Sequence, residues 1–305
     1  MNRRNRGFFL ILVVAVVAAL AAILVNFGVD AQLDTLTSGN FRDGVKARQK
    51  AKSVLEGAKI AIEKGQWHEP EVIPFISKQM GHTDICKGWI VDEEGKLPVN
   101  RLIYEGEDGI EILRRYWVIK GGSPASFHAL VDWVDRDDTT VYGETESSFY
   151  GKLGKLPPNR SLQSPYEIAI IPFMKKEIER LKKLKEPPLT RDLTVWGDGK
   201  VNLLTASRDV LMSLSDGVTP ELAERIIEER DLGHIREMDD FVRVIHVPPA
   251  VNRAFQKWGT LRSTAFRVYV EAEYRKVRFA LWVVFEQRGG RIKTLYYREG
   301  LWQPA

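Results

Sequence analysis

An acidic loop that follows an apolar, helix-like segment holds the side chains best suited to bind a cation. Asp135, Asp137 and Glu146 stand at positions 1, 3 and 12 of a loop counted from Asp135. This is the carboxylate spacing of an EF-hand, but position 6 is Thr140 and not the required glycine. Carboxylate oxygens suit Ca²⁺, and Gly143 allows a tight turn, so the loop is a candidate calcium site although it is not an EF-hand. The alternative is a solvated acidic loop without metal.

Other residue types that could carry catalysis lack a supporting pattern. Cys86 has no CxxC partner and no nearby helix N-terminus that would activate its thiol. Lys152 and Lys155 lie near glycines but form no P-loop, and the sequence contains no nucleophile elbow. The histidines show no metal-ligand spacing; they are His68, His82, His128, His234 and His246. We therefore expect a protein that is not an enzyme.

Residues 201–244 have the pattern of paired short helices and resemble a helix-hairpin-helix module. In such modules the backbone N–H groups of a Gly-hydrophobic-Gly hairpin bind DNA phosphates. Here the hairpin is residues 215–219, and Asp216 stands where an anion would approach. This favours a packing module, so nucleic acid is not an expected partner.

The composition is that of a globular protein with a small excess of positive charge. The chain has 305 residues, 44% of them apolar and 28% charged, which allows one large or two ordinary domains. The net charge of +4 does not by itself argue for nucleic-acid binding. Cys86 is the only cysteine, so no intrachain disulfide can form, and stability must come from the core or from bound partners or ions.

The N-terminal segment 8–29 predicts a membrane-spanning helix. It carries no charge, and 15 of its 22 residues are Phe, Ile, Leu or Val. As a helix it would rise roughly 33 Å, enough to cross a bilayer. Three arginines precede it and two aspartates follow it, so the positive-inside rule predicts a cytoplasmic N-terminus with the bulk of the chain outside. These flanking residues are Arg3, Arg4, Arg6, Asp30 and Asp34.

Three interpretations of this segment remain open. It could be a permanent anchor, or a secretory signal cleaved before Gln32, although its apolar run is long for a signal. The third interpretation rests on the basic residues 1–7, which end in Gly7 and precede Phe8. Such a leader resembles that of type IV pilins and type II secretion pseudopilins, which a prepilin peptidase cuts after the glycine. Those proteins usually carry Glu at the fifth mature position, where this chain has Leu12.

Apolar residues continue beyond the membrane segment at spacings of three and four, which predicts one helix over residues 8–64. Its half at 30–65 would lay an apolar stripe on a folded domain, and the helix would end at Gly65. At 1.5 Å per residue this helix would be roughly 85 Å long. The alternative is an anchor followed by a separate amphipathic helix.

The remaining pattern predicts an α+β fold, with the long helix packed on a small antiparallel sheet. We expect a β-hairpin over residues 88–103, with its turn at Gly95 in a positive-φ conformation, and three antiparallel strands after Thr264. Residues 66–106 and 262–305 would form this core, and 107–261 an inserted α-helical domain. The expected helices in the insertion are residues 110–118, the segment capped by Ser123, 165–169, 173–185, the segments capped by Ser207 and Thr219, and 238–244.

Four motifs, taken in order, resemble a known family. They are Asp92-Glu-Glu-Gly-Lys-Leu-Pro-Val-Asn100, Asp132-Trp-Val-Asp-Arg-Asp137, Gly143-Glu-Thr-Glu-Ser-Ser-Phe-Tyr150 and Val201-Asn-Leu-Leu-Thr-Ala206. With the leader and the long helix, they are similar to the type II secretion minor pseudopilin K (general secretion pathway protein K) family. The resemblance covers nearly the whole chain.

This resemblance implies a structural role in protein export rather than catalysis. It implies a subunit at the tip of the pseudopilus, with minor pseudopilins I and J and other pseudopilus subunits as partners. It also implies inner-membrane insertion through residues 8–29 and processing by prepilin peptidase. Family members of the K type also lack the Glu that Leu12 replaces. The family carries calcium in the region of the acidic loop, where this chain has Ser147 in place of a usual Asp.

Two other functions remain as alternatives. One is a membrane-anchored DNA receptor, as in competence, that uses its helix-hairpin-helix module. Such proteins usually end near that module, whereas here a strand-rich segment follows it. The other is a minor type IV pilin.

Overall fold

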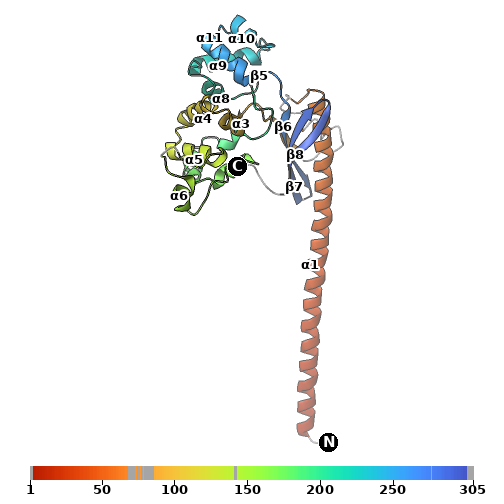
Figure 1. Ribbon diagram of the computed structural model, residues 1–305. Helices are drawn as coiled ribbons and strands as arrows, with labels where there is room; N and C mark the ends of the chain where they lie inside the picture. Colours follow the sequence, from red (N-terminus) through yellow and green to blue (C-terminus); the bar gives the residue numbers. More distant parts are fainter. Residues whose placement is uncertain are drawn as a thin grey trace.

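The computed structural model describes residues 3–67, 86–140, 143–275 and 277–300, together with Ile73, Ile76 and Lys78. One long helix, a four-stranded sheet and a larger, mainly helical part make up the chain (Figure 1). The fold is α+β, as the sequence predicts. The loop expected around Pro70 and Pro74 lies outside the described residues.

Helix α1 (Arg3–Glu63) is continuous, as the recurring three- and four-residue spacings predict. Its N-terminal part projects away from the folded domain, and its length and composition suffice to cross a membrane (Figure 1). At its other end the N–H of Gln66 bonds to the carbonyl of Ala61 at 2.8 Å, and Gly65 adopts a positive φ of 68°. This is the glycine-ended cap that closes many helices.

The sheet contains strands β1 (Cys86–Asp92), β6 (Ala265–Tyr274), β7 (Val277–Arg288) and β8 (Arg291–Gly300), in the order β1-β6-β7-β8. All neighbouring pairs are antiparallel, and the three C-terminal strands confirm the alternating pattern seen after Thr264. Gly289 and Gly290 form the last turn with φ values of 56° and 74°, which suit the tight turns of two-residue hairpins.

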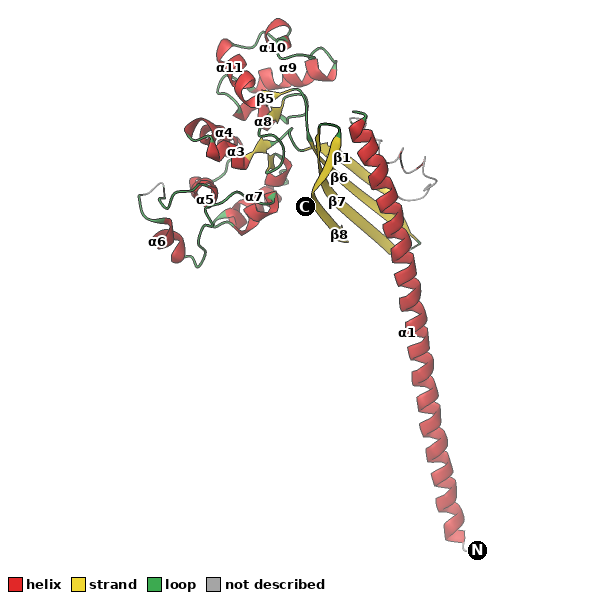
Figure 2. Cartoon of the chain, turned by 45° about the vertical axis from the view of Figure 1, so that its right-hand side comes forward, coloured by secondary structure: helices red, strands yellow, loops and turns green. Residues whose placement is uncertain are grey.

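The two faces of the sheet pack against different parts of the chain. Helix α1 crosses one face (Figure 2), where Ala51, Val54 and Ala58 are fully buried against Val268 and Val283. The small alanines let the helix backbone approach the strands, because they keep the side-chain layer thin. The opposite face is aromatic and is turned toward the helical part.

The helical part spans residues 97–260 and has its own large hydrophobic cluster. It contains β2 (Leu97–Pro98), α3 (Val99–Tyr104), α4 (Glu107–Ile119), α5 (Pro124–Val134), α6 (Glu146–Gly151), η1 (Pro165–Ile170), α7 (Met174–Leu184), η2 (Leu189–Arg191), β3 (Leu193–Thr194), β4 (Val201–Asn202), α8 (Arg208–Ser213), α9 (Pro220–Asp231), α10 (Asp240–Arg243), α11 (Pro249–Trp258) and β5 (Gly259–Thr260). Three predicted caps are confirmed, because the hydroxyls of Ser123, Ser207 and Thr219 accept the backbone N–H groups of Ser126, Val210 and Leu222.

The predicted hairpin over residues 88–103 is wrong. Strand β1 pairs with β6, and β2 pairs in parallel with β3. The intervening segment is not an exposed turn, because Glu93 and Glu94 are 0% and 1% exposed. Gly95 does not have a positive φ. Its lack of a side chain instead lets the backbone of Thr205 pack closely against it, because a Cβ there would lie 3.0 Å from the Thr205 carbonyl oxygen.

The predicted boundary between the α+β core and the inserted helical domain, at residue 106, also lies too late in the chain. Leu97, Val99 and Leu102 are fully buried in the cluster of the helical part, not in the core under the sheet. The chain therefore leaves the sheet at Asp92 and enters the helical part within a few residues. At the other end, β5 finishes at Thr260 and β6 begins at Ala265.

Candidate metal centre and the seam beside the sheet

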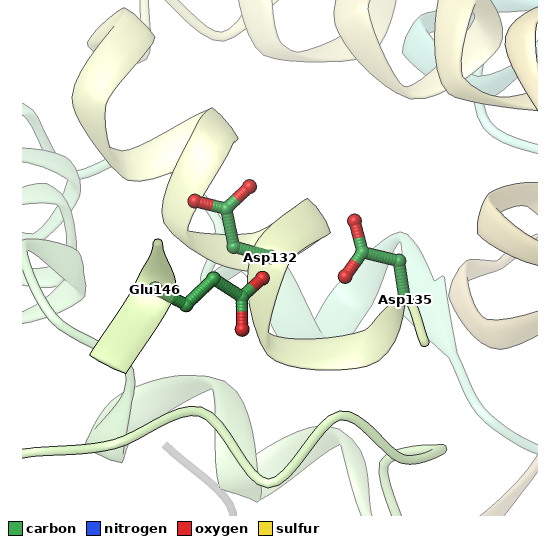
Figure 3. Close-up of side chains that lie close together, drawn as sticks. All are labelled: Asp132, Asp135 and Glu146. Atoms are coloured by element: carbon green, nitrogen blue, oxygen red, sulfur yellow. The ribbon is translucent and has the colours of Figure 1, made fainter. Parts of the chain in front are cut away.

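Three carboxylates converge where α5 ends and α6 begins. One oxygen each of Asp132, Asp135 and Glu146 lies within 4.8 Å of the others. Asp132 belongs to the last turn of α5, Asp135 caps that helix, and Glu146 is the first residue of α6. Figure 3 shows these three side chains close together at the end of α5 and the start of α6. Their position fits the acidic loop that the sequence singles out.

Local backbone bonds fold the loop back so that Glu146 faces α5. Thr140 N–H bonds to the carbonyl of Glu144 at 2.9 Å, and Gly143 N–H bonds back to the carbonyl of Thr140 at 2.9 Å. Gly143 has a φ of 78°, a conformation that favours glycine. The Thr145 side chain then accepts the N–H of Ser148 and starts α6.

Burial and mutual repulsion make all three acids weaker than usual. Burial, followed by the charges of Asp137 and Glu146, raises the pKa of Asp135 to about 7. Burial also raises the pKa of Glu146 to about 7, although the nearby amide of Asn159 acts to lower it. The pKa of Asp132 is raised by burial, although Tyr150 donates a hydrogen bond of 2.7 Å to its Oδ2. The three acids therefore lose their protons less readily than free carboxyls, unless a cation offsets the charge that forms.

Some of these carboxylate oxygens also lack hydrogen-bond donors. Within the described ranges, Asp135 Oδ1 and both oxygens of Glu146 are buried without a partner. The Asn159 amide lowers the pKa of Glu146, but its hydrogen bond is to the carbonyl of Asp137, at 2.6 Å. Burying unpaired anions is costly unless a cation offsets them. Three hard oxygen donors of this kind fit Ca²⁺.

The structure changes one member of the predicted ligand set. Asp135 and Glu146 belong to the cluster, but Asp137 does not, because its exposed carboxylate caps the loop by accepting the N–H of Thr139 at 2.8 Å. Asp132 takes its place. A signal for Asp132 was available in its spacing of three from Asp135, which puts both on one side of a helix end. Ser147 is exposed, and its hydroxyl contacts Thr145 Oγ1 at 3.3 Å.

A second polar cluster lies at the end of β1, in the seam, by which we mean the boundary between the sheet and the helical part. Asp92 Oδ2 accepts hydrogen bonds from Asn202 Nδ2, Thr205 Oγ1 and Ser263 Oγ at 2.9, 2.6 and 2.6 Å. Glu94 accepts the backbone N–H of Thr264 at 2.6 Å. The first and last of the four sequence motifs therefore meet here.

The neighbouring acid Glu93 lies between two cations. Its Oε1 accepts from Lys96 Nζ at 2.7 Å and from Arg267, while Thr194 donates to Oε2 at 2.6 Å. Burial would raise the pKa of Glu93, but Lys96 and Arg267 hold it below its usual value. Sequence reasoning identified this segment as a turn and so missed its role as a buried ionic cluster.

The hairpin of the helix-hairpin-helix-like region packs against another helix. Asp216 pairs with Arg115 Nε of α4 at 2.6 Å. A Cβ at Gly217 would come within 2.7 Å of the Val251 side chain, so this glycine serves packing. These contacts agree with the packing role that the sequence favours.

Residues 201–254 match the family model described as type II secretion system (T2SS), protein K. The whole fold resembles a chain in the crystal structure of the GspK–GspI–GspJ complex of the enterotoxigenic Escherichia coli type 2 secretion system. That match has a TM-score of 0.62 and 12% identity, and it covers 88% of this chain and 99% of that one. Over residues 201–254 the chain is therefore similar to the protein K family, and its fold is like that of the crystallised chain. Among curated proteins, none shows significant similarity over the sequence.

The family match and the fold match together support a minor pseudopilin of type II secretion. The long apolar α1 fits the membrane anchor of such a subunit. The matched segment 201–254 contains β4, α8 and α9, and with them the Asn202 and Thr205 that bind Asp92. The family signature thus includes the residues that join the helical part to the sheet.

Proposed function

We propose that this minor pseudopilin occupies the tip of the pseudopilus and assembles there with pseudopilins I and J. The observation that carries the proposal is the fold match over 99% of the chain from the GspK–GspI–GspJ complex. The helical part beside the sheet supports a tip position, because a bulky insertion would obstruct subunits stacked above it. The role is structural rather than catalytic.

Leu12 provides a second argument for the tip. A carboxylate at this position would need a positive partner in the membrane, since an unpaired charge in lipid is costly. Leu12 is apolar and 49% exposed on α1. A tip subunit has no subunit above it to pair with, so an apolar residue suits it.

The orientation follows from the flanking charges. Arg3, Arg4 and Arg6 precede the apolar segment and Asp30 and Asp34 follow it, which favours a cytoplasmic N-terminus and a periplasmic domain in the inner membrane. Prepilin peptidase would cut after Gly7 and leave Phe8 as the first residue.

Calcium would bind at Asp132, Asp135 and Glu146. The buried, unpaired oxygens described above support this, because Ca²⁺ would supply the missing positive charge. When bound, the ion would tie α6 to the end of α5. Its role would then be to hold the loop of the helical part in one conformation.

Co-purification tests the assembly proposal. The full-length chain is expressed with pseudopilins I and J from the same system, extracted in a neutral detergent and analysed by size-exclusion chromatography with light scattering. We expect a ternary complex that survives moderate salt. Elution of the chain apart from both partners would contradict the proposal, whereas salt-sensitive retention of duplex DNA would favour the DNA-receptor alternative.

A further inference from the structure

A cavity of about 520 Å³ lies between the aromatic face of the sheet and the helical part. Lys87, Trp89 and Arg267 line it from β1 and β6, and Tyr166 and Arg191 line it from the helical part. None of these residues belongs to the calcium group or to the membrane segment. The seam cavity, as we name this space, is therefore separate from the functions already described.

Two buried cations face the seam cavity and share one carboxylate. Lys96 and Arg267 are 4% and 8% exposed, and both form ion pairs with Glu93. An ammonium can donate three hydrogen bonds, yet Glu93 Oε1 is the one acceptor bonded to Lys96 Nζ among the described residues. Arg267 Nε and Nη2 both lie against that same Oε1. Donors and positive charge thus exceed the acceptors that face them.

The rim of the seam cavity adds further positive charge and an apolar shelf. Lys87 and Arg191 are exposed at its edge. Trp89 is 42% exposed and stacks on Tyr269 with ring centroids 4.3 Å apart and planes 26° apart. An exposed tryptophan held flat in this way offers a rigid apolar contact at small entropic cost. Glu271 is the one acidic residue among the described lining residues, and it already accepts a hydrogen bond from Tyr269.

We propose that the seam cavity binds an acidic peptide segment of a partner protein. A carboxylate of the peptide would accept hydrogen bonds from Lys96 and Arg267, and a neighbouring apolar side chain would lie on Trp89. Charge complementarity favours this occupant, because carboxylates match guanidinium and ammonium donors in charge and geometry. The proposal does not depend on calcium or on a position at the tip.

Fluorescence anisotropy with the full-length chain in neutral detergent tests the proposal. The probes are two labelled octapeptides, one alternating Leu with Glu and one alternating Leu with Gln. We expect the Glu peptide to bind at least about tenfold more tightly than the Gln peptide, and its affinity to fall with salt.

Variants at the rim avoid disturbing the buried ions, since removing Lys96 or Arg267 would leave Glu93 unpaired. The double variant Lys87→Glu/Arg191→Glu should weaken binding of the Glu peptide by about tenfold or more. The control Lys182→Glu/Arg253→Glu changes the net charge equally at exposed sites outside the cavity lining, and it should leave binding unchanged. Trp89→Ala should weaken binding in the same direction as the rim variant.

Carbodiimide coupling gives an independent readout, because it joins a bound carboxylate to a nearby amine. We expect mass spectrometry to locate the cross-link at Lys96 or Lys87. Equal affinity for both peptides, no binding at millimolar concentration, or equal loss in the control variant would overturn the proposal. Cross-links spread over surface lysines elsewhere would overturn it as well.

Discussion

The side chain of Asn202 donates a hydrogen bond to Asp92 Oδ2 over 2.9 Å and thereby joins the two main parts of the chain. Asp92 ends β1 of the sheet, and Asn202 belongs to β4 of the helical part. Both residues are buried, at 5% and 2% exposure. Thr205 and Ser263 donate to the same oxygen. Asp92 therefore holds three segments of the chain together at the boundary between the sheet and the helical part.

We predict that Asn202→Ala destabilises the chain by about 1–3 kcal/mol, the usual cost of leaving a buried polar partner unsatisfied. The substitution removes a donor to Asp92 and also the acceptor of the Leu204 N–H, which lies 3.0 Å away. Urea unfolding of the full-length chain in detergent, followed by tryptophan fluorescence, measures the change.

Asn252→Ala is the matched control for this substitution. Among the described residues, Asn252 Oδ1 has no hydrogen-bond partner. The Asn252→Ala substitution should therefore lower the free energy of unfolding clearly less than Asn202→Ala does. Similar losses for the two variants would show that the bond to Asp92 contributes little to stability.

The metal-free chain should lose stability as pH rises from about 4 to about 7. Asp135 and Glu146 have ordinary pKa values of 3.8 and 4.5, and burial raises both to about 7 in the folded state. The folded state therefore binds more protons than the unfolded state within this window, so folding is favoured at its acidic end. Melting temperatures in the presence of chelator, measured at several pH values, test this.

Added Ca²⁺ should reverse this trend. At pH 8 the acids are ionised and the ion offsets their repulsion, so the melting temperature should rise well above the value in chelator. At pH 5 protons compete for the same oxygens, so the rise should be small. The double variant Asp135→Asn/Glu146→Gln should remove the pH trend and the calcium effect together. An equal calcium effect at both pH values would argue against this site.

Asp132 and Asp137 should contribute differently to calcium affinity. Asp132→Asn replaces a carboxylate of the cluster, so calorimetry should show at least about a tenfold loss of affinity. Asp137→Asn should reduce calcium affinity less, because the Asp137 side chain lies outside the cluster and caps the loop by accepting the N–H of Thr139. If the Asp137 variant loses more affinity than the Asp132 variant, the ligand set inferred from the structure is wrong.

Processing of the leader should leave Phe8 as the N-terminal residue. Intact-mass analysis and N-terminal sequencing of the chain co-expressed with prepilin peptidase test this expectation. Gly7→Leu should block the cut, and the uncut chain should stay in the membrane through residues 8–29. A mature chain that begins at Gln32 would point to a secretory signal, and an unprocessed Met1 to a permanent anchor.

Local patterns in the sequence predicted much of this fold. The apolar spacing of α1, the alternation in β6 to β8 and the caps at Ser123, Ser207 and Thr219 depend on residues close in the chain. Such patterns act through neighbours a few positions apart, so one sequence is enough to detect them. The acidic loop was found in the same way.

The sequence by itself thus determined the long helix, the antiparallel C-terminal strands and the family motifs. Tertiary structure alone decided that β1 pairs with β6, since the Asp92–Phe266 pair joins residues far apart in the chain. It also decided that Asp132 joins Asp135 and Glu146 while Asp137 turns to solvent. The physical reason is common to both: pairing across long separations and burial of charge depend on which surfaces meet after folding, and no local spacing encodes that.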